Sequence, residues 1–203
     1  MPNWNLSNEA TLAVGLTATA LVLLLILWLI RRSTNPKVCR RKVTALLKRY
    51  AGIRQFKVLA DLNLEYEGKK AHFDQVLIGF YGISFITCLS ESVAYYGQEQ
   101  DEKWSRVDGS KKEYFPNPLI AGEKGIDTVR QIFSKNQVYN IQMEHLVVFA
   151  GARKKTEVDV KASAPVLKRK ELQQLLGRVK YQKDNSVDVD QLAALLEKYA
   201  KKA

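Results

Sequence analysis

The side chains in this sequence whose types most often catalyse reactions or bind transition metals are two cysteines and two histidines. They are Cys39, Cys88, His72 and His145. Neither histidine has a cysteine or another histidine at the spacing of a zinc site, so no metal centre is indicated. No Walker sequence, GxSxG sequence or dinucleotide fingerprint is present. The residues therefore suggest no small-molecule substrate. Cys39 and Cys88 are predicted to be free thiols in a reducing compartment. Cys88 lies in an apolar run and is predicted to be a core residue.

An apolar run near the N-terminus indicates a membrane anchor. Residues 11–30, TLAVGLTATALVLLLILWLI, contain no ionisable side chain. As a helix they would span roughly 30 Å, the thickness of a bilayer's hydrocarbon core. A core helix would keep a polar stripe, and a cleavable signal peptide would begin with basic residues. Residues 1–10 contain Glu9 but no Lys or Arg, whereas Arg31 and Arg32 follow the run. We therefore expect a retained single-pass transmembrane helix over 11–30.

The positive charge of the chain is concentrated directly after this run. The net charge is +11, and residues 31–57 contain ten basic side chains and no acidic one. Basic residues beside a span mark its cytoplasmic side, so we expect the N-terminus outside the cell membrane and the domain in the cytoplasm. The basic juxtamembrane segment is residues 31–41. The side chains predicted to contact anionic lipid headgroups at the membrane surface are Arg31, Arg32, Lys37, Arg40, Arg41 and Lys42.

Hydrophobic periodicity after a helix break at Asn35-Pro36 predicts one mixed α/β domain. Predicted strands cover 56–64, 72–79, 83–89 and 145–150. The first three are expected to be adjacent in one sheet, with a hairpin at Tyr81-Gly82. Predicted helices cover 37–50, 126–133, 168–179, in which Val179 is expected to be buried, and the stretch capped by Asp188. Apolar residues alternate with polar ones along 56–64, which predicts that all of them face one side of the sheet. The region 98–112 is polar and contains a turn signal at Asp108-Gly109.

Five pieces of sequence occur in an order that resembles the NERD family, the nuclease-related domain. They are FKVLADLNL, HFDQVLIGFYGISFI, YYG, FPNPL and HLVVFA. The resemblance covers residues 42–150 and leaves 151–203 as a linker and C-terminal helices. It implies a PD-(D/E)xK fold like that of restriction endonucleases, a mixed sheet flanked by helices. Proteins with this fold use a divalent metal to cut DNA.

The resemblance also shows which catalytic groups are missing. In the family pattern a strand acid and an E-x-K pair in the next strand hold Mg²⁺ and activate water. The first acid matches Asp74, but the E-x-K positions are Thr87-Cys88-Leu89. The comparison thus predicts that no catalytic residue, cofactor or metal ligand remains and that Asp74 is vestigial. Glu91, which shares strand parity with Thr87, is the candidate that would restore a metal site.

We therefore expect a membrane-anchored, catalytically inactive module that binds nucleic acid or a protein. The basic residues predicted to contact nucleic acid are Lys111, Lys112, Arg153, Lys154 and Lys155. Two alternatives stay open. One is a Mg²⁺-dependent DNA nuclease with a rearranged active site, which would need a second carboxylate near Asp74. The other is a structural subunit of a membrane assembly, in which the small pair Gly15 and Thr19 brings helices together.

Overall fold

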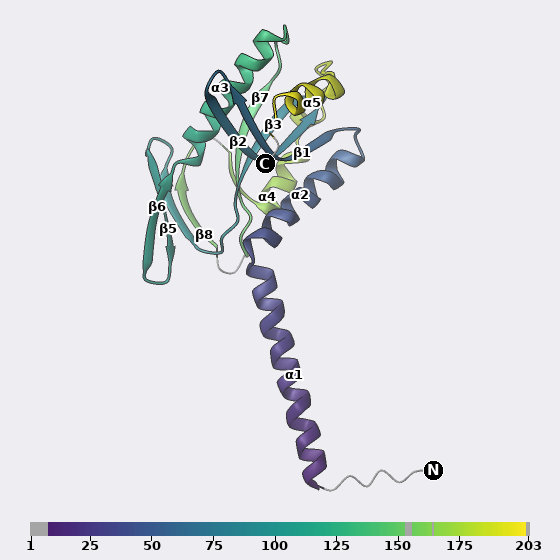
Figure 1. Cartoon of the computed structure of the whole chain (residues 1–203), viewed down its shortest axis with the longest axis vertical. Coiled ribbons are helices and arrows are strands. Elements are labelled where there is room, and N and C mark those ends of the chain that lie inside the picture. Colours follow the sequence, from purple (N-terminus) through teal and green to yellow (C-terminus); the bar gives the residue numbers. More distant parts are fainter. Residues whose placement is uncertain (1–7, 153–155, 164, 202–203) are drawn as a thin grey trace, which may run out of the picture.

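The computed structural model describes residues 8–152, 156–163 and 165–201. Its elements in chain order are α1 (Asn8–Thr34), α2 (Pro36–Gly52), β1 (Lys57–Tyr66), β2 (Lys69–Gly79), β3 (Gly82–Leu89), β4 (Ala94–Gln98), β5 (Lys103–Asp108), β6 (Lys111–Pro116), α3 (Pro118–Lys135), β7 (Met143–Phe149), β8 (Glu157–Lys161), β9 (Val166–Lys168), α4 (Arg169–Leu176), the 3₁₀ turn Val179–Tyr181 and α5 (Val189–Lys198). The chain is thus a mixed α/β protein, as predicted. Helix α1 projects from the rest as one long rod (Figure 1).

The rod has the length and composition of a membrane span. Every residue from Gly15 to Arg32 is exposed, which excludes a helix buried in the domain core. An apolar helix at this position is found in membrane anchors and in signal sequences alike. Arg31 and Arg32 lie in its last turn, and the guanidinium of Arg32 lies 5.0 Å from the centre of the Trp28 ring. The structure therefore gives a candidate span and leaves its orientation open.

Helix α2 begins where the sequence predicts a break. Asn35 is its N-cap, since the side-chain Oδ1 accepts a hydrogen bond from the Lys37 backbone N at 2.9 Å, and Pro36 occupies the first turn. Both features favour a helix start. The buried residues recur every fourth position, at Cys39, Val43, Leu47 and Ala51. One stripe of α2 therefore packs on the domain while its basic residues remain at the surface.

The main sheet has the strand order β1-β2-β3-β7-β9. Strands β1, β2 and β3 form an antiparallel meander, and the tight connection between β2 and β3 pairs Gly79 with Gly82. Strand β7 lies parallel to β3, with Thr87 opposite Val147, and β9 lies parallel to β7. The predicted neighbours 56–64, 72–79 and 83–89 are confirmed, and 145–150 joins the same sheet.

The alternation predicted along 56–64 is wrong in its first half. Phe56 and Val58 pack against the cluster beneath α2 and α4, whereas Leu62 and Leu64 are buried beneath α3 and α5. Asp61, between these pairs, has a φ of 56°. A non-glycine residue in this left-handed region breaks the regular pleat. The strand therefore changes the face on which its apolar residues lie, and periodicity alone did not reveal this break.

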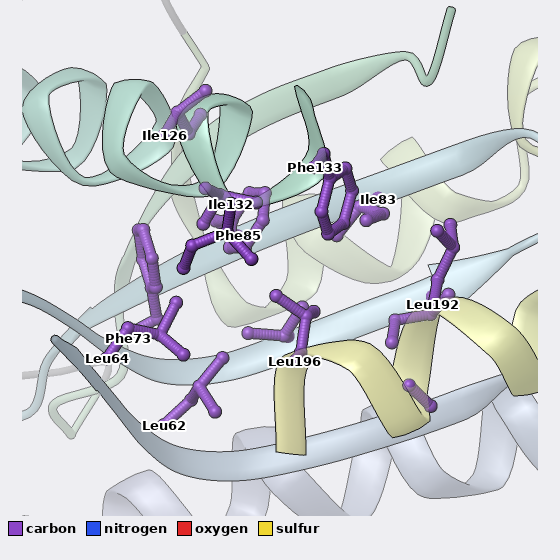
Figure 2. Packing of buried hydrophobic residues seen from close by; sticks show 14 of the residues in the cluster. Leu62, Leu64, Phe73, Ile83, Phe85, Ile126, Ile132, Phe133, Leu192 and Leu196 are labelled. Carbon is purple, nitrogen blue, oxygen red and sulfur yellow. The ribbon is translucent and has the colours of Figure 1, made fainter. Parts of the chain in front are cut away.

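Two helical layers cover the main sheet. Helices α3 and α5 enclose one face (Figure 2), where Phe73 and Phe85 have ring centroids 4.4 Å apart and Ile132 and Leu196 are fully buried. Helices α2 and α4 cover the other face. The cap of α5 is confirmed, because Asp188 Oδ1 accepts a hydrogen bond from the Gln191 backbone N.

The C-terminal region differs from its prediction in two ways. Helix α4 ends at Leu176 before Gly177, so Val179, expected to be buried, is 81% exposed. Strands β8 and β9 lie in the stretch that the sequence assigned to a linker. Because both strands pair only with distant segments, the local sequence carried little signal for them.

A second, smaller sheet was not predicted. Its order is β6-β5-β4-β8, and it covers most of the region that the sequence classed only as polar. The turn signal at Asp108-Gly109 is confirmed, since Asp108 pairs with Lys111 and Gly109 has a φ of 59°. Trp104 anchors the sheet from β5, with no exposed surface.

Candidate functional site

Asp74, the acid that matches the family pattern, lies where β2 and β3 diverge. The last regular pair between the two strands is Gln75 with Ile86. One position further along, Asp74 Oδ2 accepts a hydrogen bond from the Cys88 backbone N at 2.5 Å. The side chain of Asp74 is only 5% exposed. The carboxylate thus replaces a missing strand partner and ties the end of β3 to β2.

The second oxygen of this carboxylate faces two basic side chains. Arg40 Nη2 of helix α2 lies 3.0 Å from Asp74 Oδ1, and His72 Nε2 lies 3.4 Å from the same oxygen. Oδ1 has no well-aligned hydrogen bond in the described structure, so charge rather than directional bonding holds Arg40 in place. Arg40 was predicted to face lipid headgroups. The structure pairs it with a carboxylate of its own domain and leaves 44% of its side chain exposed, so its contact with lipid stays a prediction.

The two positions of the missing E-x-K pair carry neutral groups. Thr87 Oγ1 shares a hydrogen bond of 2.9 Å with Nε2 of His145 on the neighbouring strand β7. Burial lowers the pKa of His145 to about 4, so this imidazole is neutral at pH 7. Leu89 packs against the cluster that contains Trp104 and Phe149. These two positions therefore supply neither a carboxylate nor an ammonium group.

Close packing by α3 fixes His145. Gly122 faces the ring, and a Cβ at this position would lie 2.2 Å from His145 Cε1. Glycine is thus required by contact rather than by backbone conformation. The sequence had excluded His145 as a zinc ligand but had given it no role. Its contact with Thr87 depends on the parallel pairing of β3 with β7, which are far apart in the chain.

The Cys88 side chain belongs to a buried polar contact with helix α2. Its thiol donates to Gln75 Oε1 at 2.9 Å, and Gln75 Nε2 donates to Thr44 Oγ1 at 3.2 Å. Burial and, secondarily, the Asp74 charge raise the pKa of Cys88, so the thiol stays protonated. The prediction that Cys88 is a core residue is confirmed.

Glu91, the candidate for a restored metal site, belongs to a different cluster. Its Oε2 lies 2.7 Å from Arg106 Nη1, while Arg106 Nη2 lies 2.7 Å from Glu113 Oε2. Lys111 and Arg106 lower the pKa of Glu113, and the Glu113 hydrogen bond raises the pKa of Arg106. Among the described residues, no group of three or more His, Cys, Asp or Glu side chains is arranged to hold a metal.

The residues predicted to contact nucleic acid have different positions. Lys111 Nζ lies 2.5 Å from Glu113 Oε1, and Lys112 Nζ lies 5.1 Å from the centre of the Tyr114 ring. Residues 153–155, which are Arg153, Lys154 and Lys155, lie outside the described residues. Of the five basic residues predicted to contact nucleic acid, the structure therefore describes only Lys111 and Lys112, and Lys111 is paired with Glu113.

One surface of the small sheet was missed by sequence reasoning. Strand register places Tyr96, Ser105 and Tyr114 in one row across β4, β5 and β6. Tyr96 is 39% and Tyr114 66% exposed, and they line a hollow of about 310 Å³ with Lys103 and Lys161. We call Tyr96, Ser105 and Tyr114 the tyrosine row, and Lys103 and Lys161 its flanking lysines. Exposed tyrosines in a polar region were the only signal for them.

The architecture defines the class of this protein as a mixed α/β domain joined at its N-terminus to an apolar helix. The family model of the nuclease-related domain, NERD, matches residues 37–150. The chain therefore belongs to the NERD family, and the resemblance seen in the sequence is confirmed. Comparison with curated proteins gave no match, and neither did comparison with solved structures.

Proposed function

We propose that this chain is a membrane-anchored NERD protein that does not cut DNA and acts by binding a partner in the cytoplasm. The observation that carries the proposal is the position of Arg40, whose guanidinium lies 3.0 Å from Asp74 Oδ1. The carboxylate that would hold a metal in a nuclease of this type holds a cation of the chain itself. Its other oxygen accepts the Cys88 backbone hydrogen bond.

The chemistry of metal binding supports this assignment. Mg²⁺ sheds its waters reluctantly and is usually held by more than one anionic or strongly polar oxygen. At Asp74 the neighbouring groups are Arg40 and His72, and Thr87 and His145 replace an acid near the end of β3. Neutral or positive groups cannot balance a dication. Leu89 offers no ammonium group to stabilise the charge that develops on a cleaved phosphate.

The apolar helix and the charge that follows it support anchoring with the domain in the cytoplasm. Lys37, Arg41 and Lys42 are exposed on the first turns of α2, directly after the candidate span. Such a cluster favours retention on the cytoplasmic side and attraction to anionic lipid. Extraction separates anchoring from surface adsorption: full-length protein should stay with membranes in alkaline carbonate and in high salt. Release by either wash would show that the helix is not inserted in the membrane and would contradict the proposed anchoring.

Nucleic acid is the partner that the surface favours. The tyrosine row offers two exposed rings on which unpaired bases can stack, and Lys103, Lys112 and Lys161 lie on the same face by register. Asp159 and Glu157 lie on this face too, and Asp101 lines the hollow, so these acids weaken its positive potential. We therefore propose single-stranded rather than double-stranded nucleic acid, because stacking carries more of the contact than charge does.

The test combines cleavage and binding on the full-length chain in neutral detergent. Wild-type protein should leave single- and double-stranded DNA intact in Mg²⁺ and in Mn²⁺. Tyr96→Ala with Tyr114→Ala should weaken binding of a fluorescent oligonucleotide by about tenfold or more, from the loss of two stacking contacts. The matched control is Tyr139→Ala, which removes a 63% exposed tyrosine elsewhere.

Two results would contradict the proposal. Cleavage by the wild type that Asp74→Asn abolishes would make Asp74 catalytic and favour the rearranged nuclease, with Glu91 as the first partner to test. Unchanged oligonucleotide binding in the tyrosine variant would remove the tyrosine row as the binding surface. The alternative of a structural membrane subunit has less support, because the Thr19 hydroxyl bonds to carbonyls of its own helix, at 2.8 Å for Leu16.

A further inference from the structure

A second cavity lies on the opposite face of the main sheet from α3, between α2 and α4. Its volume is about 790 Å³. Helix α2 contributes Cys39, Lys42 and Leu46. The end of β9 contributes Lys168, and the first turn of α4 contributes Arg169 and Lys170. Leu46 of α2 and Ala150, which is 3% exposed, form the apolar floor. The cavity therefore has an apolar base and a rim of basic side chains from distant parts of the sequence.

The charge around this cavity is strongly one-sided. Among the described residues that line it, four are cations, Lys42, Lys168, Arg169 and Lys170, and one is a carboxylate, Glu171. Glu171 Oε2 accepts a hydrogen bond from the Lys168 backbone N at 2.7 Å, where it closes the first turn of α4. Within the ranges that the structure describes, none of the four cations forms an ion pair with a carboxylate. The cavity thus has unbalanced positive charge of the kind that binds an anion.

The cavity also lies close to the membrane end of the domain. Lys42 is six residues after Pro36, the first residue of α2, which corresponds to about 9 Å along the helix axis. Helix α4 lies beside α2, just beyond the junction with α1 (Figure 1). Lys42 is ten residues after Arg32, the last residue of the candidate span, so about 15 Å of helical chain separates the two.

We propose that this cavity binds the phosphate headgroup of an anionic membrane lipid, an inference that rests on the proposed anchoring. Arg169 provides a planar fork for two phosphate oxygens, and the three lysines provide point charges. The volume exceeds that of a phosphate group, which leaves room for the glycerol portion over Leu46 and Ala150. Such a site would fix the rotation of the domain about α1 and present the tyrosine row in a constant direction.

The experiment uses full-length protein in neutral detergent and four soluble probes. They are dioctanoyl-phosphatidylglycerol, dioctanoyl-phosphatidylcholine, glycerol 3-phosphate and inorganic phosphate, each titrated by calorimetry. We expect the anionic lipid to bind most tightly. Arg169→Gln with Lys170→Gln should weaken its binding at least tenfold, because two charge-assisted contacts are lost. Lys124→Gln with Lys183→Gln is the matched control. It removes two positive charges, one from α3 and one from the segment just before Asn185. The Asn185 backbone N donates a hydrogen bond to the Phe80 carbonyl, at the opposite end of the main sheet from the cavity.

Each outcome decides the proposal. Loss of lipid binding only in the Arg169/Lys170 variant supports it. Equal loss in both variants would show a general charge effect and would overturn the site. Equally tight binding of glycerol 3-phosphate or inorganic phosphate would assign the cavity to a soluble phosphate compound instead of a lipid. Alkaline extraction of the same preparation reports on anchoring independently, so a failed anchor and a failed headgroup site are distinguishable.

Discussion

The Asp74 region and the cavity between α2 and α4 differ in whether their charged side chains are paired. At Asp74 a buried carboxylate is matched by Arg40 and by the Cys88 backbone, and the neighbouring imidazole of His145 is neutral. At the cavity, Lys42, Arg169 and their neighbours line an open volume, with one carboxylate among the described lining residues. Charges that are satisfied internally stabilise a fold, whereas unbalanced charge beside a cavity attracts a ligand.

This contrast favours the cavity over the Asp74 region as a binding site. The family resemblance directs attention to Asp74, but the groups around it are already paired. Helix α2 supplies both regions, with Arg40 directed to one and Lys42 to the other. Two basic residues only two positions apart therefore have different roles, because helical spacing places them on different sides of the helix axis.

The largest effect is expected from a change that removes the sheet supporting both regions. Leu77→Asp buries a charge at a position with no exposed surface, in the cluster beneath α2. A buried charge without a partner costs more than the whole stability of a small domain. We expect no cooperative thermal transition by circular dichroism. Val179→Asp is the control, because Val179 is 81% exposed and the variant should melt like the wild type. A folded Leu77→Asp protein would contradict the assigned core.

The next largest effect concerns the neutral centre around His145. Burial lowers its pKa from 6.5 to about 4, so the unfolded chain binds more protons than the folded one between these values. His145 therefore stabilises the fold fully above pH 6.5, and this contribution falls as the pH drops towards 4. The difference is about 3 kcal/mol. Denaturant unfolding at pH 7 and pH 4.5 should show a smaller pH dependence for His145→Gln than for the wild type. If the free energy of unfolding changed equally with pH in both proteins, His145 would be solvated in the folded state.

A smaller effect separates Arg40 from its neighbours on α2. Arg40→Gln removes the cation that faces the buried Asp74 carboxylate, and we expect a loss of about 2 kcal/mol in the free energy of unfolding. Arg41→Gln is the matched control, since Arg41 is exposed and takes part in no ion pair of the described residues. Asp74→Asn added to Arg40→Gln should recover part of the loss. Equal effects of the two arginine variants would remove the distinction between Arg40 and the surface charges.

The smallest effect on stability is expected at the cavity. Arg169→Gln with Lys170→Gln should change the free energy of unfolding by less than about 0.5 kcal/mol in the absence of lipid, because both side chains are exposed and unpaired. Thermal melting in neutral detergent measures this. A stabilisation within this limit would fit the comparison, since relief of repulsion has that sign. A loss of about 1 kcal/mol or more would contradict it, because it would show that these cations stabilise the fold, as Arg40 does.

Much of the fold followed from local patterns. The break at Asn35-Pro36, the hairpin between β2 and β3 and the Asp188 cap depend on residues close together in the chain, and each was predicted correctly. Strands β8 and β9 were not predicted, because they have only five and three residues and their pairing partners, β4 and β7, lie elsewhere in the chain. The reversal at Asp61 was missed for a related reason, since periodicity assumes one buried face along a strand.

The sequence by itself determined the family, the apolar helix, the basic segment after it and the absence of an E-x-K pair at Thr87 and Leu89. The tertiary structure decided the partners: Arg40 with Asp74, Thr87 with His145, Glu91 with Arg106, and Lys42 with the start of α4 around one cavity. Residue types and spacing fix which groups are available and which local structures form. Charges act over distance in space, so only the packing of remote segments decides which of them are neutralised and which remain free to bind.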